Sequence, residues 1–305
     1  MNNETKELLK QIADLHSVPQ GAYNIRENGK LAGRKTSQHI DIVSKTTTSG
    51  IDIYVKDGTK NESLHIPVVI TQGGLDDLVY NDFHIGDNCD ILIVAGCGIH
   101  NNTNQKSSHD GIHTFKIGKN SKVKYVEKHL GLGKVTSQKI LNPTTKIELG
   151  KNSTFEMETV QLKGVCFADR KTYASISEGG TLLISEKILT ENQDVAKTYF
   201  EVKLNGENSK VEVISRAVAK DSSKQSFVSN VIGENKCFGH VECDGVISDN
   251  ASIASTPSLE ARCKDAELVH EAAIGKISEE QIVKLETLGL SREEAERKIV
   301  DGFLR

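Results

Sequence analysis

The stretch Phe83-His84-Ile85-Gly86-Asp87-Asn88 recurs along the chain at a regular interval. It returns as Phe115-Lys116-Ile117-Gly118-Lys119-Asn120 and as Ile147-Glu148-Leu149-Gly150-Lys151-Asn152, with weaker copies at residues 174–179 and 202–206. The glycines of successive copies are 32, 32, 29 and 27 residues apart. A repeat of this length is typical of solenoids and other arrays of stacked units.

Each copy predicts a strand followed by a tight turn. Apolar and polar residues alternate with the period of two that a half-buried strand requires, and the Gly and Asn that follow tolerate positive φ. Because one coil cannot bury its own apolar face, stacked coils have to supply the core. A β-sandwich is the alternative, but its turns recur about every 8–12 residues. We therefore expect a mainly β protein built as a solenoid.

The composition suits this architecture and excludes several kinds of partner. The 305 residues include 25 glycines, no tryptophan and only 5% aromatic residues, as expected for thin cores and many turns. The net charge of −4 provides no field to attract nucleic acid or an anionic membrane. The sequence contains no apolar run of about 20 residues and no signal-peptide pattern. We expect a cytoplasmic protein with no nucleic-acid or membrane partner.

The two ends of the chain differ from its middle. Residues 1–16 are expected to form a helix, since Leu8, Leu9, Ile12 and Leu15 recur at helical spacing. Residues 17–276 form the predicted solenoid core, and residues 277–305 a two-helix tail.

The tail carries two predicted capping boxes, with Ser278 three residues before Gln281 and Ser291 three residues before Glu294. Gly289 lies between the two helices as a predicted C-cap. The helices either close the last coil or present an apolar groove to a partner. The predicted docking side chains are Ile282, Leu285, Leu288, Ile299 and Phe303.

One group of candidate metal ligands lies near the start of the solenoid. Cys97, His100, His109 and His113 combine a thiol with imidazoles, which suit iron, zinc or copper. Their spacing matches no standard structural zinc motif, and the six cysteines of the chain include no Cys-x-x-Cys pair. Solvated or structural histidines are the alternative.

A second group lies near the end. Cys243 and His270 are 27 residues apart, about one repeat, so they are expected on adjacent coils with Glu271 beside them. Such a group can be a hydrolase's nucleophile and base, but no nucleophile elbow accompanies it. The sequence also contains no phosphate-binding Gly-x4-Gly-Lys-Ser/Thr motif, so the chain is not expected to bind ATP by that route.

These last residues resemble a known family. The stretches Glu242-Cys243-Asp244-Gly245-Val246-Ile247 and His270-Glu271-Ala272-Ala273-Ile274-Gly275-Lys276-Ile277 are similar to the C-terminal core of SufB and SufD, the iron–sulfur cluster assembly scaffolds of the SUF system. Pro257, Leu259-Glu260 and the tail extend the match, and residues 24–29 and 66–68 resemble the family's entry into its β-helix.

The resemblance implies a right-handed parallel β-helix that binds a SufC-like ABC ATPase through its C-terminal helices. It also implies pairing of two subunits through their last strands, a sulfur donor and acceptor apoproteins. It assigns the building of a transient iron–sulfur cluster to Cys243, His270 and Glu271, and makes the chain a non-enzymatic scaffold, since ATP hydrolysis belongs to the partner.

The sequence departs from the family in two respects. It lacks the long N-terminal helical region of many relatives, and His270-Glu271 resembles SufB whereas Gly275-Lys276 is more like SufD. This mixture implies a compact form that pairs with itself as a homodimer. A structural SufD-like subunit that does not bind the cluster is the main alternative, and a carbohydrate-active β-helix enzyme is a more distant one.

Overall fold

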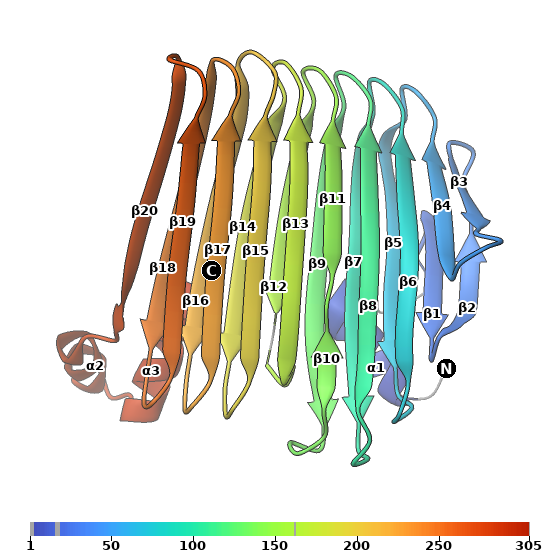
Figure 1. Ribbon diagram of the computed structural model, residues 1–305. Helices are drawn as coiled ribbons and strands as arrows, with labels where there is room; N and C mark the ends of the chain where they lie inside the picture. The colour runs from blue at the N-terminus through green and yellow to red at the C-terminus, as the bar shows by residue number, and fades with distance from the viewer. Residues whose placement is uncertain (1–2, 16–18, 162, 305) are drawn as a thin grey trace.

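The computed structural model describes residues 3–15, 19–161 and 163–304 as a two-sheet parallel β-solenoid (Figure 1). The predicted fold class is thereby confirmed. The predicted N-terminal helix is observed as α1, Asn3–Ala13, and residues 1, 2 and 16 of that prediction lie outside the described residues. The tail contains α2, Glu279–Glu286, and α3, Arg292–Phe303.

The strands alternate between the two sheets. They are β1 Ala22–Glu27, β2 Lys30–Lys35, β3 Ile40–Ser44, β4 Gly50–Val55, β5 Lys60–Ile70, β6 Asp76–Ile85, β7 Asp90–Asn101, β8 Ser107–Ile117, β9 Lys122–Gly133, β10 Lys139–Leu141, β11 Thr144–Leu149, β12 Thr154–Gln161, β13 Phe167–Ile176, β14 Thr181–Thr190, β15 Val195–Leu204, β16 Ser209–Ala219, β17 Lys224–Gly233, β18 Cys237–Ile247, β19 Ser252–Ala261 and β20 Ala266–Lys276.

Each coil gives one strand to each sheet. One sheet has the order β2-β1-β5-β7-β9-β12-β14-β16-β18-β20, and the other runs from β19 through β17, β15, β13, β10, β8, β6 and β4 to β3, with β11 between β8 and β13. At the N-terminal end, β2 and β3 pair antiparallel with β1 and β4. The C-terminal end has no such addition among the described strands, and β19 and β20 are its edges.

The turns explain the repeat. Asn88, Asn120 and Asn152 have φ of 57°, 54° and 55°, and Gly179 follows in the same stack with φ of 64°. Gly179 therefore replaces the turn asparagine. Ser177 occupies the position of Gly86, Gly118 and Gly150, since its N–H donates to Leu149 O. The predicted alignment of Gly179 with those glycines was wrong, because the coil between them is shorter than 32 residues.

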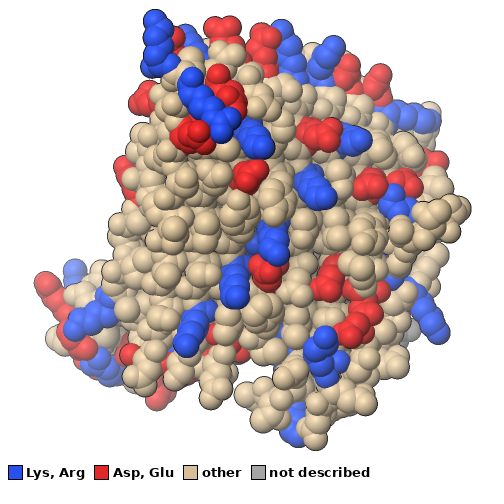
Figure 2. Space-filling model, in the orientation of Figure 1, with Lys and Arg blue, Asp and Glu red and all other residues tan. Residues whose placement is uncertain are grey.

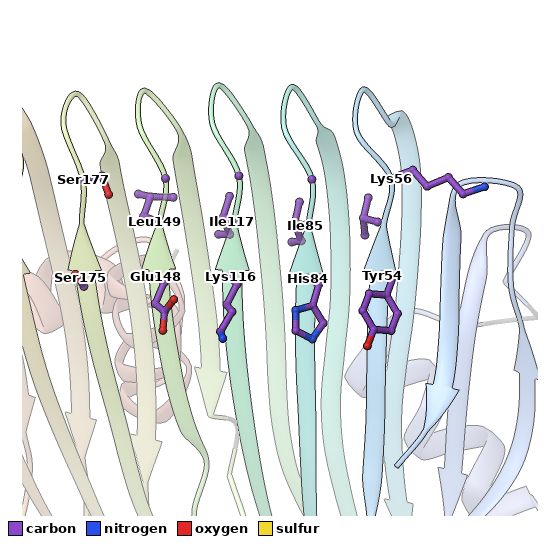
Figure 3. A pocket seen from close by; sticks show the side chains of 14 residues that line it. Tyr54, Lys56, His84, Ile85, Lys116, Ile117, Glu148, Leu149, Ser175 and Ser177 are labelled. Carbon is purple, nitrogen blue, oxygen red and sulfur yellow. The ribbon is translucent and has the colours of Figure 1, made fainter. Parts of the chain in front are cut away.

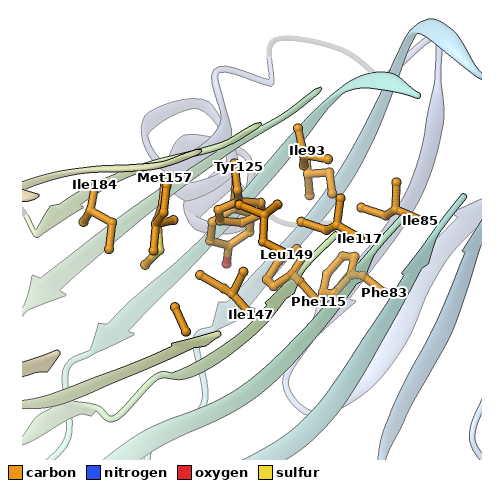
Figure 4. Packing of buried hydrophobic residues seen from close by; sticks show 14 of the residues in the cluster. Phe83, Ile85, Ile93, Phe115, Ile117, Tyr125, Ile147, Leu149, Met157 and Ile184 are labelled. Atoms are coloured by element: carbon orange, nitrogen blue, oxygen red, sulfur yellow. The ribbon is translucent and has the colours of Figure 1, made fainter. Parts of the chain in front are cut away.

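The core lies between the two sheets and is made by every second residue along each strand, the one that faces inward. Phe83 and Phe115 stack with ring centroids 4.2 Å apart (Figure 4). The ring centroid of Phe155 lies 5.0 Å from that of Phe115. Coils stack these rings in register because Phe83 pairs with Phe115 across β6 and β8. Packing thus propagates from coil to coil, as expected for a solenoid.

One cysteine, Cys89, has a structural role after one of the turns. The Cys89 N–H donates to Ser121 Oγ at 3.0 Å, and the Ser121 N–H donates to Ser153 Oγ at 2.9 Å. Cys89 therefore occupies the position that serine fills in the next two coils. Burial raises the pKa of its thiol, so the thiol is protonated at neutral pH.

Candidate functional site

The last two coils bring Cys243 and His270 to the same face. Cys243 lies on β18 and pairs with Ala272 of β20, whereas His270 pairs with Val241. Paired residues in parallel strands point the same way, and Val241 and Cys243 are both buried core residues. Both predicted ligands therefore face the solenoid interior on adjacent coils, offset by two residues along the strands.

Glu271 points the other way. It is the next residue after His270 in a strand, so its side chain lies on the outer face, where Glu271 Oε2 is 3.8 Å from His240 Nε2. Within one chain Glu271 thus lies apart from Cys243. His240 was not predicted from the sequence. An alignment of the coils would have indicated it, because Glu242 is the register partner of Glu271 and His240 lies two residues before Glu242, on the same face.

The electrostatics keep both inward ligands neutral. Burial raises the pKa of Cys243 to about 12, although the Ser255 hydroxyl beside it acts in the opposite direction. Burial, followed by the nearby His240, lowers the pKa of His270. The Nε2 atom of His270 is buried and has no hydrogen-bond partner among the described residues. A neutral imidazole with an unpartnered nitrogen, on the same face as a thiol of the adjacent coil, is suited to binding a transition metal.

The first predicted group is divided by the strand alternation. Cys97 faces inward on β7, in register with His129 of β9, while His109 and His113 face inward on β8. His100 faces outward, with its Nδ1 3.6 Å from Glu4 Oε1 of α1. The structure therefore brings Cys97, His109 and His113 to one small cavity and leaves His100 outside it. Among the residues described, no three His, Cys, Asp or Glu side chains are already grouped to hold a metal ion.

A buried network of charged and polar side chains continues from this cavity through the solenoid. Arg170 reaches from β13 to Glu127 of β9 at 3.1 Å, to Glu186 of β14 at 3.3 Å, and to His129 Nδ1 at 3.1 Å. Burial favours the protonated form of Glu127, but His129 and Arg170 outweigh it and hold the pKa of Glu127 well below its usual range. Burial raises the pKa of Glu186, with Arg170 acting against it.

The sequence prediction missed this network. Tyr125, Glu127 and His129 occupy alternate inward positions of β9, so a polar pair on an otherwise apolar face was visible. Its partner, Arg170, lies in the opposite sheet, 43 residues along the chain from Glu127. This separation does not match the length of one coil, so the repeat does not reveal the contact. Only the cross-sheet packing identifies it.

A groove of about 730 Å³ runs across several coils on the outer face. Tyr54, His84, Lys116 and Glu148 line it in a row on successive strands (Figure 3). Among the described residues that line the groove, Glu148 is the only one with a carboxylate. Glycoside hydrolysis normally requires two, so this groove does not support the carbohydrate-active alternative.

The tail forms a helical hairpin. Arg292 of α3 bonds to Glu279 of α2 at 2.6 and 3.0 Å, and Ile282 is buried at 2% exposure. The capping box at Ser291 is confirmed, whereas Ser278 makes no side-chain cap bond, so that prediction was wrong. Of the predicted docking side chains, Leu288 is 75% exposed and Leu285, Ile299 and Phe303 are partly exposed.

No helix in the described part of the chain has the length and apolar character needed to cross a bilayer. All six cysteines are free thiols.

Known proteins are similar to this chain over most of its length. The family model described as SUF system FeS cluster assembly, SufBD core domain, matches residues 81–303. An iron–sulfur cluster assembly SufBD family protein of Archaeoglobus fulgidus is 32% identical over 228 residues, covering 74% of this chain and 60% of that protein. A Methanocaldococcus jannaschii protein of the same description is 29% identical over 255 residues, 83% of this chain and 79% of that protein.

A third relative, from Pyrococcus horikoshii, is 27% identical over 288 residues, which cover 90% of this chain and 84% of that protein. The chain thus spans 60% of the Archaeoglobus relative's length and larger shares of the other two. The family match covers the strands that carry Cys243 and His270 as well as both tail helices. The resemblance is therefore confirmed, and the chain belongs to the SufBD family of the SUF system for iron–sulfur cluster assembly.

Proposed function

We propose that this protein is a non-enzymatic scaffold on which two copies of the chain build a nascent iron–sulfur cluster. The cluster forms where the C-terminal ends of the two solenoids meet, and an ABC ATPase of the SufC type binds the tail helices. A sulfur donor supplies sulfide equivalents and acceptor apoproteins receive the cluster. The free thiols are consistent with a reducing cytoplasm.

The asymmetry of the two solenoid ends supports the homodimer. In inner coils the inward-facing side chains are buried, but in the last coil Leu259 is 39% and Ile274 41% exposed. They pair with the buried inward positions Val231 and Gly245, so they belong to the core face and lack a next coil to cover them. Two open edges with an apolar core face are a surface for strand addition, and a second copy supplies matching strands.

The outer surface of the sheet that contains β17 and β19 carries few charges near this end, whereas the outward-facing residues of β18 and β20 include Glu242, Asp244, Glu267 and Glu271. The outward-facing residues of β17 and β19 include Ser226, Val228, Asn230, Thr256 and Ser258. In Figure 2, charged side chains gather along the turns and the tail, and much of the visible strand surface is uncharged. Depletion of charge is typical of the central part of an interface.

The observation that carries the cluster proposal is the inward-facing pair of Cys243 and His270, with His270 Nε2 buried and unpartnered. A two-fold axis near β20 would bring the pairs of two chains together. Thiolate and imidazole are established ligands of iron–sulfur clusters, and metal binding deprotonates a coordinating thiol despite its raised pKa. In this proposal, Glu271 and His240 on the outer face hold iron before it reaches the thiols.

The test is the iron and sulfide content of protein purified anaerobically together with its ATPase. Cys243→Ala is expected to reduce both to background while leaving the thermal midpoint nearly unchanged, since it removes only a small thiol. Cys89→Ser is the matched control, because serine fills that position in the next two coils. If Cys243→Ala retains iron and sulfide at the wild-type level, the cluster site is elsewhere; if wild-type protein binds neither, the structural SufD-like role is correct.

Leu288→Asp tests the tail. Its side chain is 75% exposed, so the change adds a charge to the proposed docking face without disturbing the hairpin. We expect ATPase binding to weaken at least about tenfold, because the carboxylate must be desolvated in an apolar contact. Affinity is measured by isothermal calorimetry, with Lys298→Asp on the exposed side of α3 as control. Unchanged affinity for Leu288→Asp would place the ATPase on another surface.

A further inference from the structure

A small cavity inside the N-terminal half of the solenoid is lined in part by side chains of the kinds that bind metals. It is lined by Cys97, His109, His113, Glu127 and His129, together with the buried amide of Asn81 and apolar residues. Its volume is about 10 Å³, which is the space that one water molecule or one metal ion requires. It lies between β7, β8 and β9, several coils away from Cys243 on β18.

Two histidines point into the same space. A Cβ atom placed on Gly111 would lie 2.8 Å from His113 Nε2 and 3.3 Å from His109 Nε2. The absence of a side chain at Gly111 therefore keeps open the spot that both nitrogens face. Each histidine is at least nine-tenths buried, and neither Nε2 has a hydrogen-bond partner among the described residues.

The other nitrogen of each ring fixes its tautomer. Asp77 Oδ2 lies 3.1 Å from His109 Nδ1, and Arg26 bonds to the same carboxylate at 2.9 Å. The carboxylate therefore stays ionised and accepts the Nδ1 proton of His109, which leaves a lone pair on Nε2. This carboxylate–histidine arrangement is the usual support of a metal-binding imidazole.

His113 is held in the same way by a relay. The Tyr125 hydroxyl donates to Glu127 at 3.1 Å and lies 3.0 Å from His113 Nδ1. Because the hydroxyl proton is used on Glu127, the Tyr125 oxygen accepts from Nδ1–H of His113, and Nε2 again carries a lone pair. His129 differs, since its Nδ1 accepts from Arg170 and its Nε2 faces Glu127 at 3.4 Å.

We propose that this cavity binds one divalent first-row transition-metal ion, of the Fe²⁺ or Zn²⁺ class, through His109 Nε2 and His113 Nε2. Cys97, whose thiol lines the same cavity, is the third ligand. In the present conformation the three side chains are not yet gathered around one point, so the ion draws the Cys97 sulfur inward by a side-chain rotation. A single water donating to both nitrogens is the competing occupant.

The experiment uses Co²⁺ as the probe, because its absorption spectrum reports imidazole and thiolate ligands. Full-length protein without added ATPase is dialysed anaerobically to equilibrium with Co²⁺, and bound metal and the spectrum are recorded. In the Cys243→Ser background, which removes the thiol of the proposed end-coil site, we expect one ion per chain, with a thiolate charge-transfer band that disappears when Cys97→Ala is added. Asp77→Asn is expected to weaken binding by about 10–100-fold, as loss of a carboxylate support does.

Gly111→Ala is the steric test, since it fills the space and leaves all three ligands in place; the backbone at Gly111 is ordinary strand. It is expected to abolish binding, as is His109→Gln, which covers the case in which Gly111→Ala fails to fold. His100→Ala is the control and should bind as wild type does. Cys243→Ser should also bind normally, so this result is independent of the proposed cluster site.

Three outcomes would overturn the proposal. They are no Co²⁺ retained by wild-type protein, which indicates that the cavity holds water; full binding by folded Gly111→Ala; and loss of binding in Cys243→Ser, which assigns the ion to the end coil.

Discussion

An Arg170→Met protein is expected to lose about 3–5 kcal/mol of unfolding free energy, the cost of removing one partner of a buried ion pair. Arg170 has only 3% of its side chain exposed, and Glu127 and Glu186 have 5% and 1%. Methionine preserves much of the volume but none of the charge. Two carboxyl groups would then remain in the core, and Glu127 would lack its cation.

Urea unfolding at neutral pH, followed by circular dichroism, measures this loss. The double variant Arg170→Met, Glu127→Gln should recover a large part of it, because the amide removes the charge that Arg170 left behind. Arg262→Met is the matched control, since Arg262 makes comparable contacts to Glu234 and Glu260 on the exposed surface, where ion pairs contribute little. A loss of less than about 1 kcal/mol for Arg170→Met would show that water enters this part of the core.

The coil structure could be predicted because it is encoded locally. Each turn asparagine with positive φ marks one coil, and the alternation before it fixes which side chains face inward. Coil length is set by the connections between strands, which local patterns reveal poorly. The register step falls from 32 residues between His129 and Gln161 to 27 between Ile140 and Phe167, so the coil shortens between β12 and β13. This is why Gly179 was assigned to the wrong turn position.

The candidate site could be predicted only in part. The 27-residue spacing correctly places Cys243 and His270 on adjacent coils, because spacing reports the coil and strand parity reports the face. The same parity places Glu271 on the outer face, which the motif alone did not indicate. His100 is separated from His109 and His113 for a similar reason, since it follows Cys97 by an odd number of residues on one strand.

The interior network required the three-dimensional structure. Arg170, Glu127 and Glu186 meet because two sheets face each other, and no sequence period relates positions in opposite sheets. In the sequence, the charges of these three residues resemble those of a strand face exposed to solvent. Removing one member of such a group leaves an unpaired charge in the core, and the Arg170→Met variant measures that cost.

The double variant Leu259→Asp, Ile274→Asp is expected to raise the dissociation constant of the proposed homodimer by at least about 100-fold. Both side chains belong to the core face of the last coil and are already 39% and 41% exposed, so the single chain should remain folded. In the proposed dimer they would be covered by the partner. Two-fold symmetry doubles each change, which places four carboxylates in one apolar contact.

Analytical ultracentrifugation over a concentration series measures the dissociation constant. Leu78→Asp is the matched control, because Leu78 is 44% exposed but lies on β6, far from the open end. The double variant should also lose iron and sulfide although Cys243 and His270 are intact, since each chain then holds only its own pair of ligands. A wild-type chain that stays monomeric at high concentration with the ATPase present, or a double variant that dimerises as well as Leu78→Asp, would contradict the interface. Retention of the cluster by a strictly monomeric double variant would show that one chain suffices to hold it.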